Sequence, residues 1–438
     1  MRQDFLKAGC MLCIFLGVMA YSQDIFAQYV KIPKDKMPIK MQEPAHAKGE
    51  EVQLNGITKS SQEFSFDLYR QLAKEVKENE NLFFSPTSIH VTLAMTAAGA
   101  ENNTKKQMQD VLHLANFGKK EYSGFADLMK SLTAPSEEYQ LSLANRLWGE
   151  KQYTFLPEYL DVAKTSFLAP LESMDFSGNP EKSRKVINAW VEEQTQEKIK
   201  DLLKPGVINS ATRLVLTNAV YFKGSWVSGF KKELTAEHPF RTEETLSASS
   251  EDKKNVKKVP LMYQKAKFPI YVAEDFQAIS LPYKGDRLEM IVILPNKVNG
   301  LPDLEAQLSP EFFQNILRNL SRKEVKLWLA KFKLEESFEL NEILGKMGMT
   351  DAFSSARADF SGMTGNRDLY LSAVVHKSFV DVNEEGTEAA AATAGIMMMR
   401  SMPRPQQEII FKTDHPFLFG IRDTQTGELL FFGRVVNP

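Results

Sequence analysis

The chain has almost no cysteine and no excess of charge of either sign. Its 438 residues contain two cysteines, Cys10 and Cys13, both inside an apolar run near the N-terminus. Removal of that run would leave a chain without cysteine, which excludes stabilisation of the mature fold by disulfides. The formal net charge of −2 at pH 7 excludes the basic footprint of a nucleic-acid-binding protein.

Motifs for catalysis and for metal binding are also missing. There is no Gly-x-Ser-x-Gly elbow, no His-Glu-x-x-His, no phosphate loop and no dinucleotide fingerprint. The six histidines are scattered along the chain without the spacing of metal ligands. The sequence therefore predicts no metal, no cofactor and no enzymatic activity.

The N-terminus predicts a secretory signal peptide over residues 1–27. Basic residues precede the apolar run Cys10–Tyr21, and small residues suited to cleavage follow at Ala20 and Ala27. The run is too short to span a membrane, and the residues flanking its cysteines do not suit lipid attachment. We therefore expect export to the extracellular space or a periplasm, without a lipid anchor.

Beyond the signal peptide the sequence predicts one flexible linker and one domain. Residues 28–58 mix Lys, Glu, Pro and Met without a period, which is typical of a flexible linker. The spacing Ser60-x-x-Glu63 predicts a capping box, and apolar residues every four positions from Phe64 to Val76 predict the helix behind it. The length alone suggests two domains, but no second linker interrupts residues 59–438.

The pattern of elements favours an α+β fold. Helix-like and strand-like segments mingle without a strict βαβ rhythm. Residues Asn188–Leu203 read as an amphipathic helix. Strands are predicted over Val215–Phe222, Met290–Leu294, Val325–Leu329, Val374–Val382 and Leu429–Val436.

The most informative segment is Glu384–Ser401, a run of small side chains that ends in three methionines, an arginine and a serine. An alanine run normally favours a helix, but this run lies between a predicted strand and a tail containing Pro403 and Pro405. Read as a strand, it places Thr387, Ala389, Ala391 and Thr393 on one face, where nothing is larger than threonine. Such a segment can slide between two strands without a clash.

This segment resembles the reactive-centre loop of the serpins, the large serine protease inhibitors. Five further motifs occur in the order that the family has them: Asn81-Leu-Phe-Phe-Ser-Pro-Thr-Ser-Ile-His90, Leu216-Thr-Asn-Ala-Val-Tyr-Phe-Lys-Gly-Ser-Trp226, Ala373-Val-Val-His-Lys377, Asp414-His-Pro-Phe-Leu-Phe-Gly-Ile-Arg422 and Gly433-Arg-Val-Val-Asn-Pro438. The resemblance covers nearly everything from about residue 60 to the C-terminus. It implies a single domain with a large central mixed β-sheet, two smaller sheets, about nine helices and an exposed loop over about residues 384–405.

The resemblance also assigns residues to the loop. Counting from Gly386 as the family does places the scissile bond at Arg400–Ser401. The loop hinge comprises Glu384, Gly386, Thr387, Ala389, Ala390, Ala391 and Ala392. A family ion pair at the root of the loop corresponds to Lys331 and Glu384.

Two further clusters follow from the resemblance. The shutter, a polar cluster beneath the sheet where strands must part, corresponds to Ser85, Ser88, Asn218 and His376. These four residues can equally form an ordinary buried network, and both interpretations can hold together. The breach, where insertion begins, corresponds to Trp226, His415, Pro416 and Phe417. For Trp226, plain core packing remains the alternative.

The implied function is a monomeric, suicide-substrate inhibitor of trypsin-like serine proteases. A trypsin-like enzyme recognises a basic side chain through an aspartate in its specificity pocket, and Arg400 supplies that charge. The protease would form an acyl-enzyme at Arg400, and the cleaved loop would insert as a new central strand and trap it.

Three alternatives stay open. Met398 and Met399 suit chymotrypsin-like, elastase-like or subtilisin-like pockets, so the inhibitor can be broad in range and be cut at one of these residues. A non-inhibitory serpin acting as a binding protein is the second, although Ala389–Ala392 argue against it because such relatives usually carry bulky or charged hinges. A polysaccharide activator is conceivable, but the three lysines at 119, 120 and 130 are too sparse to predict one.

Overall fold

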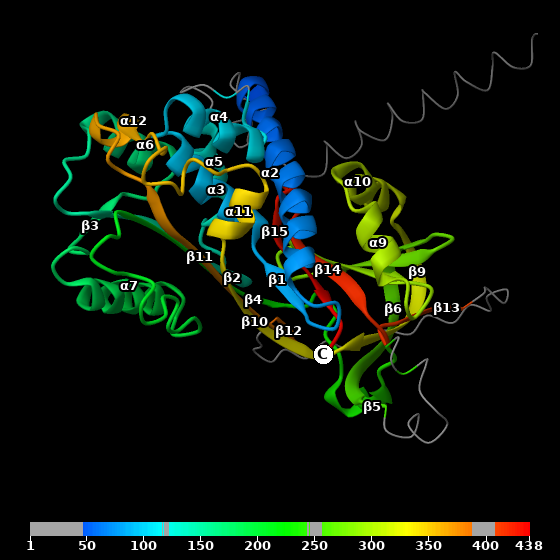
Figure 1. The fold of residues 1–438 in the computed structure, drawn as a ribbon. Helices are drawn as coiled ribbons and strands as arrows, with labels where there is room; N and C mark the ends of the chain where they lie inside the picture. Colours follow the sequence, from blue (N-terminus) through cyan, green and yellow to red (C-terminus); the bar gives the residue numbers. More distant parts are fainter. Residues whose placement is uncertain (1–46, 116, 118–121, 243–244, 246–255, 388–407) are drawn as a thin grey trace, which may run out of the picture. The chain divides into compact units, whose positions relative to one another are not determined.

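Two β-sheets carry the fold, and each draws its strands from distant parts of the chain (Figure 1). The structure is a computed structural model that describes residues 47–115, 117, 122–242, 245, 256–387 and 408–438. The predicted signal peptide and the linker as far as residue 46 lie outside the described residues.

The central sheet has six strands in the order β10-β11-β12-β4-β2-β3. Below β12, strands β4 and β11 pair directly and in parallel, with Leu214 opposite Leu371 at one end and Tyr221 opposite Phe379 at the other. Its strands are β2 (Tyr139–Glu150), β3 (Glu172–Met174), β4 (Leu214–Ser225), β10 (Phe332–Glu339), β11 (Leu371–Asn383) and β12 (Gly386–Thr387).

The second sheet has nine strands in the order β1-β15-β14-β8-β7-β6-β9-β13, with β5 paired to β6. Its strands are β1 (Leu82–Phe84), β5 (Ala236–Pro239), β6 (Lys258–Val272), β7 (Phe276–Pro282), β8 (Leu288–Pro295), β9 (Ser321–Ala330), β13 (Ile409–Lys412), β14 (Phe417–Asp423) and β15 (Leu429–Val435). The two smaller sheets expected beside the central one are thus hydrogen-bonded into one. The long strand β6 joins them, because it pairs with β5 and β9 over most of its length and with β7 at its end.

The described ranges contain ten α-helices and one 3₁₀ turn. They are α2 (Ala47–Glu75), α3 (Pro86–Ala97), α4 (Asn102–Val111), α5 (Ser123–Leu132), α6 (Pro157–Ser166), α7 (Pro180–Gln194), α9 (Leu301–Gln307), α10 (Pro310–Asn319), α11 (Asn341–Lys346), α12 (Ser361–Thr364) and η2 (Lys232–Leu234). With one central mixed sheet, a second sheet and helices outside any βαβ rhythm, the predicted α+β class is confirmed.

Helices α3 and α7 cover opposite faces of the central sheet (Figure 1). All twelve residues of α3 are buried, and its polar side chains are hydrogen-bonded inside the protein, namely Thr87, Ser88, His90, Thr92 and Thr96. Helix α7 packs Ile187 and Val191 on the other face, against Val215 of β4 and Val375 of β11. Side chains therefore alternate along β4 between an α3 face and an α7 face.

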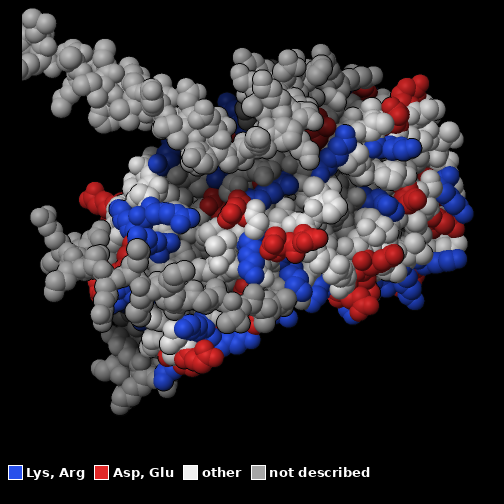
Figure 2. Space-filling model, turned by 180° about the vertical axis from the view of Figure 1, so that it is seen from behind, with Lys and Arg blue, Asp and Glu red and all other residues white. Residues whose placement is uncertain are grey.

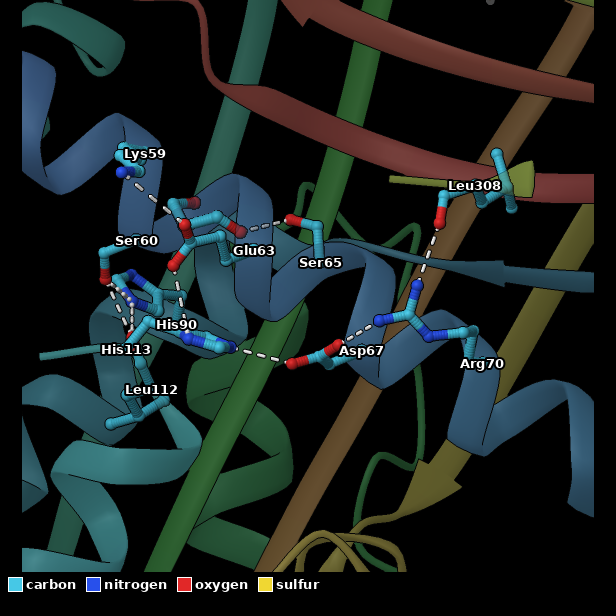
Figure 3. A network of polar contacts seen from close by, with 11 residues as sticks. Lys59, Ser60, Glu63, Ser65, Asp67, Arg70, His90, Leu112, His113 and Leu308 are labelled. Atoms are coloured by element: carbon cyan, nitrogen blue, oxygen red, sulfur yellow. Dashed lines mark hydrogen bonds and ion pairs between the residues drawn. The ribbon is translucent and has the colours of Figure 1, made fainter. Parts of the chain in front are cut away.

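Two helix boundaries differ from the sequence prediction. Helix α2 begins at Ala47, so residues 47–58 are helical rather than linker and Ser60 is not a cap. The Ser60 hydroxyl instead bonds to the carbonyl of Leu112, at 2.7 Å, and to Nε2 of His90, at 2.9 Å (Figure 3). Most of the polar residues assigned to the linker also favour a helix. The Ser60 hydroxyl does not cap the helix because it is bonded to other parts of the fold.

The second difference concerns α7, which runs over Pro180–Gln194 instead of the predicted Asn188–Leu203. Pro180 at the start favours a helix beginning there, because the first turn needs no backbone donor. Gln196 and Glu197 have φ values of 52° and 58°, which end the helix. The apolar residues beyond them, Leu202 and Leu203, are buried from a non-helical segment.

Glu428, just before β15, is a fully buried carboxyl group. Its Oε2 accepts hydrogen bonds from Ser61 of α2, at 2.7 Å, and from Thr87 of α3, at 2.8 Å, and its Oε1 has no partner among the described residues. Burial raises the pKa of Glu428 to about 7, because the hydroxyl groups offset the loss of water only in part and Asp423 adds repulsion.

This carboxyl should make the protein less stable as the pH rises. Between pH 4.5 and 7 the folded chain holds a proton on Glu428 that the unfolded chain has released, so the free energy of unfolding falls with pH, by about 3 kcal/mol at most. Glu428→Gln keeps the shape and removes the charge. Urea unfolding at pH 5 and pH 8 should show a smaller loss for the variant than for the wild type, and equal losses would contradict the assignment.

Candidate functional site

The start of the predicted loop already lies inside the central sheet. Strand β12, Gly386–Thr387, is antiparallel to both of its neighbours, with Thr387 opposite Gly224 of β4 and Val382 of β11. At this end, therefore, β4 and β11 are separated by two residues of the loop. Further along, the same two strands are paired to each other.

Gly386 is required by the close approach of this strand to β4. Its φ of 152° is unfavourable for residues with a side chain. A Cβ atom at this position would lie 2.0 Å from the backbone oxygen of Gly224. Any other residue would push the hinge away from the sheet.

Thr387 points into the core beneath β12. It is fully buried, and its hydroxyl lies 2.8 Å from that of Tyr283. The Tyr283 ring stacks on Trp226, with centroids 4.5 Å apart, and meets Phe222 edge to face. Since Phe222 belongs to the α3 face of β4, Thr387 lies on that face too.

Trp226 binds the backbone of the turn that precedes β12. Its indole Nε1 donates to the carbonyl of Asn383, at 3.0 Å, and its backbone N–H donates to that of Glu385, at 2.9 Å. Trp226 is buried, so it both packs in the core and holds the root of the loop. The two interpretations given by the sequence describe the same side chain.

Glu384 makes the ion pair that the sequence suggested, in a more buried setting than a surface pair. Its carboxylate lies 3.0 Å from Nζ of Lys331 and accepts a hydrogen bond of 2.8 Å from Thr235. Burial by itself would raise the pKa of Glu384, but the bonds from Lys331 and Thr235 outweigh it and hold the pKa below its usual value. The charged carboxylate therefore anchors the loop root.

The structure brings all four predicted shutter residues together between α3, β4 and β11. The backbone N–H of Ser85 donates to Nε2 of His376, at 3.1 Å, and Nδ1 of His376 lies 2.6 Å from Oδ1 of Asn218. Nδ2 of Asn218 lies 2.8 Å from the hydroxyl of Ser88. The bond between His376 and Asn218 crosses from β11 to β4, the pair of strands that β12 has begun to separate.

His376 is held in its neutral form. Burial lowers the pKa of His376 to about 3, because the charged imidazolium form is disfavoured away from water. Because the Ser85 N–H can only donate, Nε2 must accept and the single ring proton must be on Nδ1, where it donates to Asn218. Protonation of Nε2 would break the bond to Ser85.

Sequence reasoning missed three members of this site. Asn145 of β2 and Thr92 of α3 each lie within 3.0 Å of Nδ2 of Asn218, and Tyr283 bonds to Thr387. A signal existed for Asn145, which is an amide within the strand run Leu143–Trp148. Tyr283 gave no such signal, because only the tertiary fold brings it to the hinge.

The predicted breach is only partly assembled. His415 lies 2.8 Å from Asp414 and 2.7 Å from the carbonyl of Pro295, and Phe417 packs on Phe332. Pro416 is buried beside them. No hydrogen bond or ring contact joins this segment to Trp226 in the described part of the chain.

The reactive bond cannot be placed in the structure. Arg400 and Ser401 lie outside the described residues, as do the alternative positions Met398 and Met399 and the hinge residues Ala389–Ala392. The described hinge therefore ends at Thr387.

On the face drawn in Figure 2, basic and acidic side chains are interspersed, in keeping with the net charge of −2. No three His, Cys, Asp or Glu side chains in the described ranges are placed to hold a metal ion. Among those same ranges, no helix combines the length and the apolarity that crossing a membrane requires.

Comparison with known proteins identifies the family and the fold. Residues 59–438 match the family described as Serpin (serine protease inhibitor). The chain belongs to the serpin family. It is 44% identical to a leukocyte elastase inhibitor of Xenopus tropicalis over 392 residues, which are 88% of this chain and all of the relative, and 43% identical to human Serpin B3 over 404 residues, again 88% and 100%.

The solved structure of uncleaved ovalbumin shares this serpin's fold. It superposes with a TM-score of 0.76 at 33% identity, over 87% of this chain and all of that one. The predicted resemblance and the predicted serpin fold are both confirmed. The relative from Xenopus tropicalis is by its name an inhibitor of a protease, leukocyte elastase.

Acid should weaken the bridge between β4 and β11. The stabilisation from neutral His376 is complete above pH 6.5 and is lost as the pH falls towards 3. At pH 5 the free energy of unfolding should have fallen by about 2 kcal/mol on this account. We expect His376→Ala to have lost this bridge already. Urea unfolding at pH 7.5 and pH 5 should therefore show a smaller acid effect in the variant, with His90 contributing equally to both proteins.

The same variant tests whether the cluster controls opening of the sheet. Heated mildly at pH 7.5, His376→Ala should form ordered polymers or a self-inserted monomer, because parted strands present unpaired edges. Native gels would detect polymers that resist urea better than the starting monomer. Simple loss of structure at lower urea, without oligomers, would contradict a gating role.

Proposed function

We propose that this serpin is a suicide-substrate inhibitor of trypsin-like serine proteases, cut at Arg400–Ser401. One observation carries the proposal: Gly386 and Thr387 occupy the first two positions of a new strand between β4 and β11. The residues that would follow them into the sheet are mostly alanine. A hinge of this kind favours insertion of the loop after cleavage.

The register of β12 defines where each following residue would go. Continued along β4, it places Ala389 opposite Phe222, Ala391 opposite Val220 and Thr393 opposite Asn218. These odd-numbered loop residues would share the face of Thr387, towards α3. Small side chains fit that buried face, and the hydroxyl of Thr393 would arrive at the polar cluster.

Insertion would replace the direct pairing of β4 with β11 by a complete new strand between them. The 14 residues from Thr387 to Arg400 span about 46 Å when extended, and roughly one net hydrogen bond per residue at about 1 kcal/mol each gives a gain of order 14 kcal/mol. The bond between His376 and Asn218 must break first. The closed sheet would thus be held by a barrier until protease cleavage frees the loop.

A second candidate is cleavage at Met398 or Met399 by an elastase-like or chymotrypsin-like protease. Similarity to proteins named leukocyte elastase inhibitor favours it, and the methionines are apolar enough for such pockets. A non-inhibitory binding protein is the third candidate. The buried, small-residue start of the hinge counts against it.

Export from the cell forms part of the proposal. The apolar run Cys10–Tyr21 and the small residues after it support a signal peptide over residues 1–27. The inhibitor would then act in the extracellular space or in a periplasm. N-terminal sequencing of the protein recovered from its native source would test this.

Removing the basic side chain should separate the two candidate bonds. Arg400→Ala removes the charge that a trypsin-like pocket recognises, so we expect it to slow covalent trapping of trypsin at least about a hundredfold, roughly the loss of one buried charge pair. Met399→Ala is the matched control and should leave trypsin inhibition unchanged. Denaturing gels and mass spectrometry of the released peptide report the complex and the cleaved bond.

The Arg400 assignment would be wrong if the Arg400→Ala protein trapped trypsin as fast as the wild type does. A peptide beginning at Met399 or Arg400 would support the elastase-like candidate instead. Absence of any covalent complex across a panel of trypsin, chymotrypsin and elastase would favour the binding protein.

A charge at the hinge should convert the inhibitor into a substrate. Thr387 is fully buried against Tyr283 already in the uncut chain, so Thr387→Arg should expel the hinge from the sheet, and its return on insertion would bury an unpaired charge. We expect cleavage to continue while active protease is released, which raises the stoichiometry of inhibition several-fold. Thr387→Ser keeps the hydroxyl and is the control. Unchanged stoichiometry in the arginine variant would exclude insertion through this position.

A further inference from the structure

His113, two residues beyond the end of α4, lies between two carboxylates of α2 (Figure 3). Its Nε2 is 2.7 Å from Oδ2 of Asp67, and its Nδ1 is 3.2 Å from Oε2 of Glu63. Because carboxylate oxygens can only accept, a ring nitrogen without a proton would turn its lone pair towards an oxygen. Contacts on both sides of the ring therefore favour the doubly protonated, charged imidazolium.

Each of the two carboxylates has a second cation within reach on α2 itself. Nζ of Lys59 lies 3.9 Å from the carboxylate of Glu63, and the guanidinium of Arg70 bonds to Asp67 (Figure 3). Lysine and arginine keep their charge at pH values where a histidine has lost its proton. The carboxylates would therefore still have partners if the imidazole became neutral and moved away.

The backbone at His113 forms the turn that ends α4. Its φ of 55° is a left-handed conformation that few residues with a side chain adopt. The N–H of His113 donates to the carbonyl of Asp110, at 3.2 Å, and the N–H of Leu114 donates to that of Gln109, at 2.7 Å. The contacts of the ring with α2 thus help to hold an unfavourable turn.

Three helices meet at the carbonyl group just before this turn. The carbonyl of Leu112 accepts a hydrogen bond of 2.7 Å from Ser60 of α2 and lies 3.1 Å from Nε2 of His90 of α3. Since the Ser60 proton is directed to Leu112, Nε2 carries the single proton of neutral His90. Burial lowers the pKa of His90 to about 4, so this ring stays neutral where His113 titrates.

The charge of His113 makes its contacts with α2 depend on pH. The hydrogen bond to Asp67 raises the pKa of His113, and the charges of Asp67 and Glu63 raise it further, against burial and the charge of Arg70. Stabilisation by a group with a raised pKa is complete below about pH 6.5, the value in the unfolded chain, and is lost as the pH rises through the folded-state value. The His113 side chain is 31% exposed, so its proton can exchange with solvent.

We propose that His113 is a proton-operated latch, which fastens the end of α4 to α2 while its ring is charged and releases it when the ring loses its proton. In the released state each carboxylate keeps the cation of its own helix, and the turn after α4 relaxes. The carbonyl of Leu112 then no longer faces His90.

Release of the latch should also ease the opening of the central sheet. The bond to the Leu112 carbonyl supports α3 through His90, and α3 carries Ser88 and Thr92, which bond to Asn218 beneath β4. A relaxed turn would leave α3 with fewer fixed contacts. This second effect rests on the proposed insertion mechanism, whereas the latch itself does not.

Titration of the histidine rings by NMR tests the charge of the latch. In the full-length protein, the signal that is missing from His113→Asn should titrate above pH 6.5. Asp67→Asn removes one carboxylate from the ring and should lower this midpoint. Glu75→Gln removes a carboxylate of the same helix that pairs with Lys346 instead, and should leave it unchanged. A wild-type midpoint at or below pH 6.5, or one that Asp67→Asn does not lower, would overturn the proposal.

Hydrogen exchange of the amides of residues 112–114 tests the release. Corrected for the intrinsic exchange rate, their protection in the wild type should fall about threefold between pH 6 and pH 9, as for the loss of one partly exposed ion pair. His113→Lys stays charged over most of this range, and His113→Asn is never charged and suits the left-handed backbone. Constant protection in the wild type, or a fall in either variant equal to that of the wild type, would overturn the latch.

The effect on the sheet is measured as the rate of heat-induced polymerisation at pH 6.5 and pH 8.5. The rise in rate with pH should be about threefold larger for the wild type than for His113→Lys, and Glu428 contributes equally to both proteins. Equal rises would overturn the coupling to the sheet. Failure of the proposed inhibitory function is distinguishable, because it appears as the absence of a covalent trypsin complex at either pH.

Discussion

The hydrogen bond between His376 of β11 and Asn218 of β4 is the contact on which the function proposed for this serpin depends. It joins the two strands that the loop must separate, and it lies beyond the point where Thr387 has already entered the sheet. Burial keeps the imidazole neutral, so the bridge withstands ordinary pH but weakens in acid. The strands β4 and β11 are therefore separated at one end of the sheet and joined in the middle, and under the proposed mechanism this bond would keep the sheet closed until the loop is cut.

The root of the loop is held more firmly than a surface loop would be. Trp226 bonds to two carbonyl groups of the turn, and the buried carboxylate of Glu384 pairs with Lys331. Gly386 allows the backbone to approach β4 closely. These contacts hold the hinge between the ends of β4 and β11, so that an inserting loop would extend β12 in its present register. Two kinds of contact thus meet at this site. The root of the loop is held by Trp226 and Lys331, whereas β4 and β11 are joined by the side-chain bond between His376 and Asn218 that insertion would have to break.

Much of the fold could be predicted because its signals are local or because the family motifs are specific. The strands around Val215–Phe222 and Val374–Val382 were located, since long runs of apolar and β-branched residues specify buried strands. The predicted start of α2 was wrong, because the polar residues of its first turns have the composition of a linker. Ser60, which was predicted to cap the helix, bonds to His90 instead. Of the predicted hinge, the structure describes Glu384, Gly386 and Thr387 at the end of the central sheet, and Tyr283 and Asn145 were missed.

The sequence by itself determined the family, the α+β class, the run of small residues after Gly386 and the absence of disulfides from a chain without its N-terminal run. These properties follow from residue identity, spacing and count. Only the tertiary structure decided that Thr387 is already buried between two strands, that Glu384 is shielded from water, and that Asn145 joins Ser88 and Asn218 in one polar cluster. Such features depend on which side chains meet across strands distant in sequence, and on the direction in which each hydrogen bond in the chain must point.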